Sequence, residues 1–237
     1  MSDPFKAAAR MEGIPSAFAS TRDAIDSILR DRGLRRSTPE DTSLSLLRGA
    51  SATAALEGSA FDPSVLAGGG GDAIARAAVR LSTELLGLIP VWNRSPIQAL
   101  ARMHALAASG SVPDADLGRP VNAAGVARLT ALAAMLDQPT EAPGLVVAAL
   151  VHAEIAAAEA FETHNAVVGR AAERLVLVSR GVDPASVTVP EAGHAAAPDT
   201  YLAALDAYNE GQSGVHRWLM YASGAFTRGA EASTLAN

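Results

Sequence analysis

The stretch that decides the fold is Leu145-Val146-Val147-Ala148-Ala149-Leu150-Val151-His152-Ala153-Glu154-Ile155-Ala156-Ala157-Ala158. It is apolar on nearly every side, and a helix of that kind must be covered by other elements. The residues that follow, 159–165, are mostly polar and end in Asn165, a good N-cap for another helix. We therefore predict a central buried helix over 143–158, a polar elbow, and a second helix over 165–180.

The rest of the sequence predicts further helices around this pair and no strand. Apolar residues recur at helical spacing in each segment, and Thr38 followed by Pro39 is typical of a helix start. The predicted fold class is therefore all-α, a helical bundle around a central buried helix. The surrounding helices are expected over residues 16–32, 39–57, 72–88, 95–109, 121–137, 199–210 and 212–228.

The chain has 237 residues, enough for one sizeable domain with an extension. We divide it into an N-terminal helical extension (1–38), a helical core (39–182) and a C-terminal helical pair that packs on the core (183–237). Residues 183–190 are expected to form an extended connector. The first 15 or so residues and the tail after Arg228 are expected to be frayed, as chain ends commonly are.

Composition excludes several classes of function. The net charge is −6, which argues against non-specific binding of nucleic acid. There is no cysteine, so disulfides and thiolate-bound zinc are excluded and a reducing compartment fits. No apolar run reaches the roughly 18 residues of a membrane span. Lys6 is the sole lysine, and this preference for arginine is typical of a GC-rich genome. We expect a bacterial, cytoplasmic protein that binds neither nucleic acid nor membrane.

Familiar catalytic motifs are incomplete in this chain. The glycines at 68–71 lack the Gly-Lys-Ser/Thr ending of a phosphate-binding loop, and His152-Ala153-Glu154 lacks the cysteine pair of a zinc deaminase. The other histidines, among them His104, His194 and His216, are scattered along the sequence, so we predict no metal site. His152 is expected to be a hydrogen-bonded core histidine rather than a catalyst.

The elbow resembles the signature of the Fic (Fido) family, His-Pro-Phe-x-Asp/Glu-Gly-Asn-Gly-Arg-x-x-Arg. Aligned on Phe161, residues 159–170 read Glu-Ala-Phe-Glu-Thr-His-Asn-Ala-Val-Val-Gly-Arg, so that Phe161, Asn165 and Arg170 match. His152 lies seven positions before residue 159, where many members of the family also have a histidine. The resemblance implies a Fic-like helical bundle for most of the chain.

A second segment is similar to another Fic feature. Residues 51–58 contain Thr53-x-x-x-Glu57-Gly58, which resembles the inhibitory helix Ser/Thr-x-x-x-Glu-Gly/Asn of autoinhibited Fic proteins. In those proteins the glutamate reaches the final arginine of the motif and blocks the nucleotide's γ-phosphate. The resemblance implies inhibitory roles for Thr53 and Glu57, and we predict an ion pair between Glu57 and Arg170.

The remaining motif positions depart from the family pattern. Glu159 stands where the family has its catalytic histidine, Thr163 replaces the magnesium-binding acid, and Val167 replaces the first phosphate-binding arginine. His164 and Ala166 stand where the family has its two loop glycines. Fic enzymes transfer AMP from ATP to a target hydroxyl, and these changes remove the base, the magnesium ligand and a phosphate-binding charge. Residues 111–123, where the family's target-docking hairpin is expected, predict a short or absent hairpin.

We therefore favour a Fic-like protein with a degenerate motif that lacks AMP transfer, carries no cofactor and acts as a regulatory or binding module. The sequence does not identify a protein partner, and it is compatible with a homo-oligomer. The alternative is an active AMP transferase that uses ATP and Mg²⁺, with Glu159 or His164 as the base and with Asn165 and Arg170 binding the nucleotide. A third hypothesis is an unrelated helical interaction protein.

Overall fold

The computed structural model describes residues 3–31 and 37–235. Within these ranges the chain forms helices and no β-strand, so the all-α prediction is confirmed. The α-helices are α1 (Pro4–Ala9), α2 (Ile14–Asp31), α3 (Pro39–Leu56), α4 (Pro63–Ala67), α5 (Ala73–Leu85), α6 (Ile89–Trp92), α7 (Pro96–Ala108), α8 (Ala123–Leu136), α9 (Gly144–Ala158), α10 (Asn165–Ser179), α11 (Pro190–Ala195), α12 (Pro198–Asp206) and α13 (Gln212–Glu231). Short 3-10 turns occupy Leu86–Leu88, Asp114–Asp116 and Ala207–Asn209.

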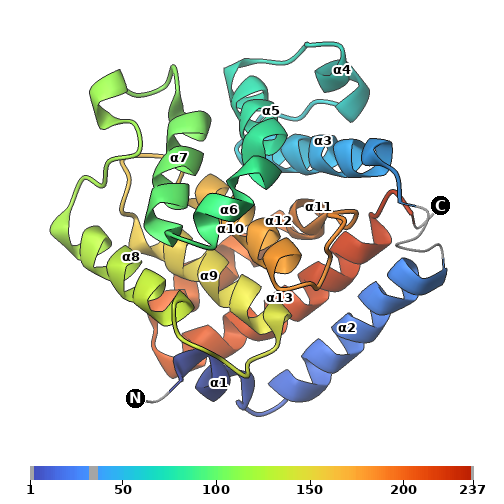
Figure 1. The fold of residues 1–237 in the computed structure, drawn as a ribbon, viewed down its shortest axis with the longest axis vertical. Helices are drawn as coiled ribbons and strands as arrows, with labels where there is room; N and C mark the ends of the chain where they lie inside the picture. The colour runs from blue at the N-terminus through green and yellow to red at the C-terminus, as the bar shows by residue number, and fades with distance from the viewer. Residues whose placement is uncertain (1–2, 32–36, 236–237) are drawn as a thin grey trace.

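Helix α9 is the centre of the molecule, as its sequence predicts. Every side chain from Leu145 to Ala153 is buried, because α9 has no polar face to turn toward water. Helix α10 packs along it, and α1, α2, α8, α12 and α13 each contact it from another side (Figure 1).

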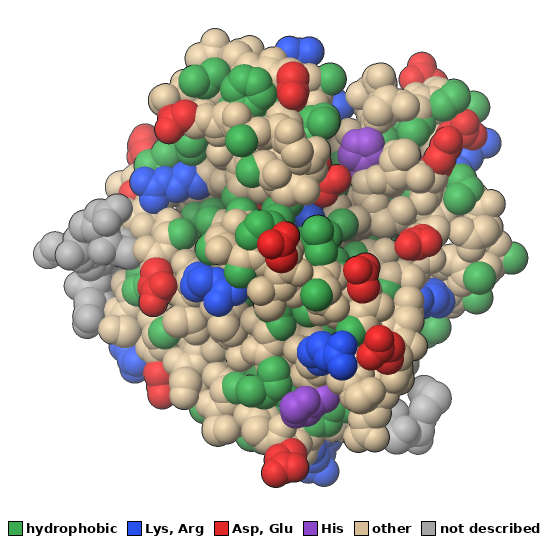
Figure 2. Space-filling view, turned by 180° about the vertical axis from the view of Figure 1, so that it is seen from behind, with side chains coloured by type: hydrophobic (Ala, Val, Ile, Leu, Met, Phe, Trp, Pro, Cys, Tyr) green, Lys and Arg blue, Asp and Glu red, His purple; other side chains and the backbone are tan. Residues whose placement is uncertain are grey.

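Two further groups of helices complete the bundle. Helices α3, α4 and α5 pack together at one end, and α2 lies alongside α13 at the other (Figure 1). Helix α3 begins where the sequence predicts, because Thr38 and Asp41 form a reciprocal capping box. Basic and acidic side chains are interspersed over the face shown in Figure 2. Among the described residues, no helix is both long and apolar enough to cross a bilayer.

The expectation of frayed ends is wrong for the residues that the structure describes. Helix α1 forms near the N-terminus, and the side chains of Phe5 and Ile14 are buried in the main hydrophobic core. At the other end α13 continues to Glu231, and Ser233 is buried with its hydroxyl donating to the carbonyl of Val187 at 2.8 Å. Apolar contacts and this hydrogen bond hold both ends on the bundle. The predicted end of the first helix, residue 32, lies outside the described residues.

Four short helices, α1, α4, α6 and α11, are missing from the predicted set. Each has four to six residues, too few for apolar periodicity to show, but each carries a proline in its first turn. The connector before α11 is also not extended. The Asp183 carboxylate accepts hydrogen bonds from the backbone N–H groups of Val187 and Thr188 and from the Thr188 hydroxyl, which folds the segment into a buried turn.

Candidate functional site

The elbow between α9 and α10 is built from two residues in the left-handed region. Glu159 has φ 45° at the end of α9, and His164 has φ 61° at the N-cap of α10. Asn165 is not the cap that its sequence position predicts. Its side chain instead accepts a hydrogen bond from the Phe161 N–H at 3.0 Å and donates one to the Phe161 carbonyl at 2.8 Å, which ties the loop together.

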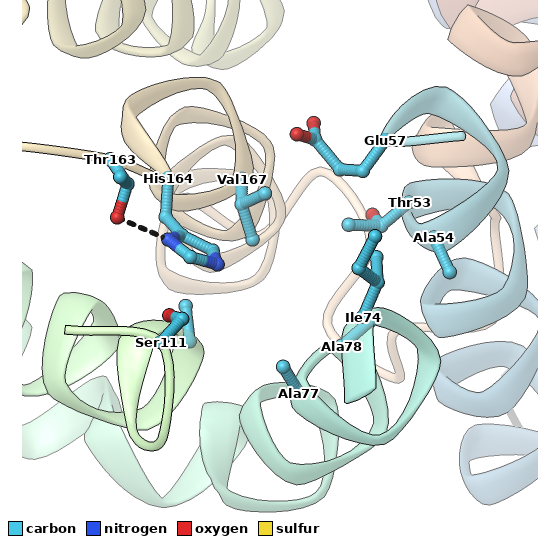
Figure 3. A pocket seen from close by; sticks show the side chains of 11 residues that line it. Thr53, Ala54, Glu57, Ile74, Ala77, Ala78, Ser111, Thr163, His164 and Val167 are labelled. Atoms are coloured by element: carbon cyan, nitrogen blue, oxygen red, sulfur yellow. Dashed lines mark hydrogen bonds between the residues drawn. The ribbon is translucent and has the colours of Figure 1, made fainter. Parts of the chain in front are cut away.

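A cavity of about 270 Å³ lies beside the elbow. Figure 3 shows side chains facing it from the end of α3, the first half of α5, the elbow with the start of α10, and Ser111, which follows α7. Its lining combines small apolar side chains with a few polar ones: Thr53, Ala54, Glu57, Ile74, Ala77, Ala78, Ala107, Ser111, Thr163, His164 and Val167. The fold thus brings together the predicted residues Thr53, Glu57 and His164. Glu159 is exposed and does not line the cavity.

The predicted ion pair between Glu57 and Arg170 forms. Arg170 Nη2 lies 2.6 Å from Glu57 Oε1, and the Arg170 side chain is 1% exposed while that of Glu57 is 35% exposed. The second Arg170 nitrogen, Nη1, donates to the Tyr201 hydroxyl at 3.0 Å. Glu57 caps the C-terminus of α3, an unfavourable end of the helix dipole for a carboxylate, so the arginine compensates its position.

His164 presents an imidazole to the cavity. Its Nδ1 lies 2.6 Å from the Thr163 hydroxyl (Figure 3). Burial lowers the pKa of His164, with nearby Arg80 acting in the same direction and Glu57 opposing them. The ring is therefore neutral at pH 7 and able to accept a proton.

His104 supports the elbow from α7, a role that the sequence did not indicate. Its ring stacks on Phe161 with centroids 4.2 Å apart, and its Nδ1 accepts a hydrogen bond from the Gly118 N–H at 2.9 Å. Burial lowers the pKa of His104 as well. Its position on the buried face of α7 was the only available signal, and the sequence alone gave no means to connect it with Phe161.

His164 also lines an adjoining hollow of about 310 Å³. Two cationic side chains of α5, Arg76 and Arg80, line this hollow as well. Both are engaged by backbone carbonyls. Arg76 donates to Gly71, and Arg80 donates to residues 106 and 109.

A buried polar network extends from Arg170 through the Tyr201 hydroxyl. His152 Nδ1 is 3.1 Å from Glu173 Oε1, and His194 Nε2 is 2.9 Å from Glu173 Oε2. The outer ring nitrogens, His152 Nε2 and His194 Nδ1, each lie 3.0 Å from a tyrosine hydroxyl, of Tyr201 and Tyr221 respectively. His152 is thus a hydrogen-bonded core residue, as predicted. Its hydrogen-bond partners, Glu173 and Tyr201, come from α10 and α12, so sequence spacing could not reveal them.

Comparison with known proteins identifies the fold. The chain matches no protein-family profile and no curated protein sequence. Its structure is similar to that of a Fic family protein from Desulfovibrio desulfuricans G20, with a TM-score of 0.74 and 17% identity over 91% of this chain and 73% of that one. It is also similar to residues 134–508 of Fic-1 from C. elegans, with a TM-score of 0.70 and 15% identity over 92% of this chain and 71% of that one. The chain therefore has the Fic (Fido) fold.

Proposed function

We propose that this Fic-fold protein does not transfer AMP and acts instead as a regulatory or binding module. The observation that carries the proposal is the lining of the cavity beside the elbow. Among the described residues that form it, none is a lysine or arginine, and Glu57 places a carboxylate in its wall. A triphosphate needs cationic side chains or a metal to offset its charge, and a carboxylate nearby repels it.

The elbow supports the same proposal. The positions that correspond to the Fic magnesium acid and first arginine carry Thr163 and Val167, and both line the cavity. A threonine hydroxyl is a weaker magnesium ligand than a carboxylate. Val167 offers the phosphates no charge. Glu159, at the position of the catalytic histidine, is exposed and outside the lining, so it is poorly placed to accept a proton from a hydroxyl in the cavity.

A specific observation favours the alternative of a nucleotide-dependent transferase with altered residues. His164 lines the cavity as a neutral imidazole, and the adjoining hollow adds Arg76 and Arg80. A phosphate group in that outer hollow would meet guanidinium groups, and His164 would serve as the base. Arg76 and Arg80 already use some of their N–H groups on backbone carbonyls, which leaves fewer for a phosphate, so we rank this candidate second.

The test is adenylylation by the purified full-length chain, with labelled ATP and Mg²⁺ and with both the chain itself and a cell lysate as targets. We expect no labelling above background. Glu57→Ala is assayed in parallel, because it removes the carboxylate and so distinguishes lost chemistry from inhibition. Glu159→His alone is expected to stay inactive, since Thr163 and Val167 still leave the phosphates unheld.

Calorimetric titration with ATP, with and without Mg²⁺, provides the binding measurement, and we expect no saturable binding. Magnesium-dependent labelling of any target would overturn the proposal. If that labelling were lost in His164→Ala but kept in Glu159→Ala, it would establish His164 as the base and support the second candidate.

A further inference from the structure

Three metal-ligating side chains meet in the core, apart from the cavity. His152 comes from α9, Glu173 from α10 and His194 from α11, and all three side chains have 0% exposure. Their ligand atoms lie within 4.8 Å of one another. We propose that these residues bind a divalent transition metal ion such as Zn²⁺. The proposal does not depend on the function proposed above.

The donor set has the geometry of a chelate. Each oxygen of the Glu173 carboxylate faces a different imidazole nitrogen, His152 Nδ1 at 3.1 Å and His194 Nε2 at 2.9 Å. The two rings stand nearly perpendicular, at 89°. Two nitrogens and a bidentate carboxylate give four donor atoms. At metal–ligand bonds of about 2.0–2.2 Å, two ligand atoms on one ion lie at most about 4.4 Å apart. The ligand atoms here all lie within 4.8 Å of one another, so the three side chains would close in on the ion when it binds.

The tyrosines supply the outer shell that such histidines require. A metal-bound imidazole normally directs its other N–H to a hydrogen-bond acceptor, which fixes the ring. Here the Tyr201 and Tyr221 hydroxyls stand 3.0 Å from the outer nitrogens of His152 and His194. Without metal each histidine donates to Glu173 and accepts from a tyrosine. With metal the ring proton would sit on the outer nitrogen, which would donate a hydrogen bond to the tyrosine hydroxyl. The Tyr201 hydroxyl already accepts from Arg170 Nη1, and its second lone pair would accept from His152.

The balance of buried charge favours a cation at this position. The two buried arginines nearby are each matched by a glutamate, Arg170 by Glu57 and Arg174 by Glu191. Glu173 is left as a buried carboxylate between two histidines. No arginine or lysine pairs with this carboxylate among the described ion pairs, and a metal ion between it and the two imidazoles would offset its charge.

Imidazole nitrogens with a carboxylate suit zinc and its neighbours rather than Mg²⁺ or Ca²⁺, which prefer oxygen ligands alone. Because all three side chains are sealed from solvent, the ion would have no open coordination position for a substrate. The inferred role is structural: the metal joins α9, α10 and α11, as closed zinc sites do.

The test is metal loading of the full chain after treatment with EDTA and dialysis. After one equivalent of Zn²⁺ and gel filtration, elemental mass spectrometry is expected to find about one ion per chain, with a raised melting temperature. His194→Gln removes one ligand and is expected to retain less than a tenth of that metal. His104→Gln and His216→Gln alter a buried and a surface histidine outside the cluster, and they are expected to bind as the unaltered chain does.

Metal-free protein after gel filtration, or equal retention by His194→Gln and the unaltered chain, would overturn the proposal. Circular dichroism establishes whether each variant folds. If His194→Gln fails to fold, X-ray absorption of the Zn²⁺-loaded unaltered chain decides the question. Two imidazole ligands are expected, and a spectrum without imidazole scattering would refute the site.

Discussion

At the residue scale, the contact between Glu57 and Arg170 holds a carboxylate at the wall of the cavity. Arg170 is buried and has two side-chain partners, Glu57 and Tyr201, while its Nε has no hydrogen-bond partner in the described protein. The carboxylate of Glu57 therefore does two things. It satisfies a buried cation, and it places a carboxylate in the wall of the cavity.

The first stability prediction concerns this pair. Glu57→Gln keeps the shape but removes the charge, leaving a buried guanidinium without its counter-ion. We expect the free energy of unfolding to fall by about 1–3 kcal/mol, between the values typical of exposed and of fully buried pairs. Arg170→Met and the double variant complete a cycle, in which the losses are expected to be non-additive by at least about 1 kcal/mol.

Urea denaturation measures each value, and Asp26→Asn is the matched control. It breaks the surface pair in which Arg22 Nε lies 2.8 Å from Asp26, and it is expected to cost less than about 1 kcal/mol. Additive losses in the Glu57 and Arg170 cycle would show that the contact has no energetic role in the folded protein.

At the scale of elements, the close approach of α9 and α10 depends on a glycine. A Cβ added at Gly169 of α10 would lie 2.8 Å from the His152 carbonyl oxygen and 2.9 Å from His152 Cδ2. Both atoms belong to the buried centre of the bundle. The small residue thus lets the second helix of the elbow lie against the first and sets the position of His152.

Gly169→Ala is therefore expected to destabilise the protein by about 1–3 kcal/mol, the usual cost of overpacking, although alanine is the better helix former by about 1 kcal/mol. Gly224→Ala in α13 is the control. There the nearest atom to an added Cβ is the Arg228 Nη1, at 3.3 Å, which lies at the end of a flexible side chain. Thermal melts should show a lower midpoint for the first variant only; an unchanged midpoint for Gly169→Ala would mean that the helices can separate without cost.

At the scale of the whole molecule, ionisable groups are buried in the core and make stability depend on pH. Burial lowers the pKa of His152 from 6.5 to about 4. For Glu173, burial alone would raise the pKa, but the neighbouring His194 and His152 outweigh it and lower the pKa. As the pH falls, His152 stays neutral and Glu173 stays ionised in the folded protein to a lower pH than in the unfolded chain.

The resulting prediction is a loss of stability in acid. Below pH 6.5 the unfolded chain takes up a proton at residue 152 that the folded protein does not accept until about pH 4, so unfolding becomes more favourable. The contribution of His152 is fully present above pH 6.5 and is lost as the pH falls toward 4, by about 3 kcal/mol in total.

Urea denaturation between pH 7.5 and 4.5, with EDTA present to exclude metal, measures this slope. His152→Gln, if folded, is expected to show a shallower slope, while His216→Gln, which alters a half-buried surface histidine outside the cluster, is expected to follow the unaltered chain. An identical slope in His152→Gln would show that other groups cause the acid sensitivity.

The sequence by itself determined the central architecture of this protein. An all-apolar run can be stable only when covered on every side, so residues 143–158 had to become the buried helix, and local caps such as Thr38 placed the neighbouring helices. The Fic-like signature and the spacing of Thr53, Glu57 and Arg170 were also local patterns, and they predicted an ion pair that the fold forms. Only the tertiary structure decided what depends on distant residues meeting: the cavity lining, the stacking of His104 on Phe161, and the convergence of His152, Glu173 and His194. These contacts join different helices, whose relative positions follow from packing of the whole core rather than from any periodicity along the chain.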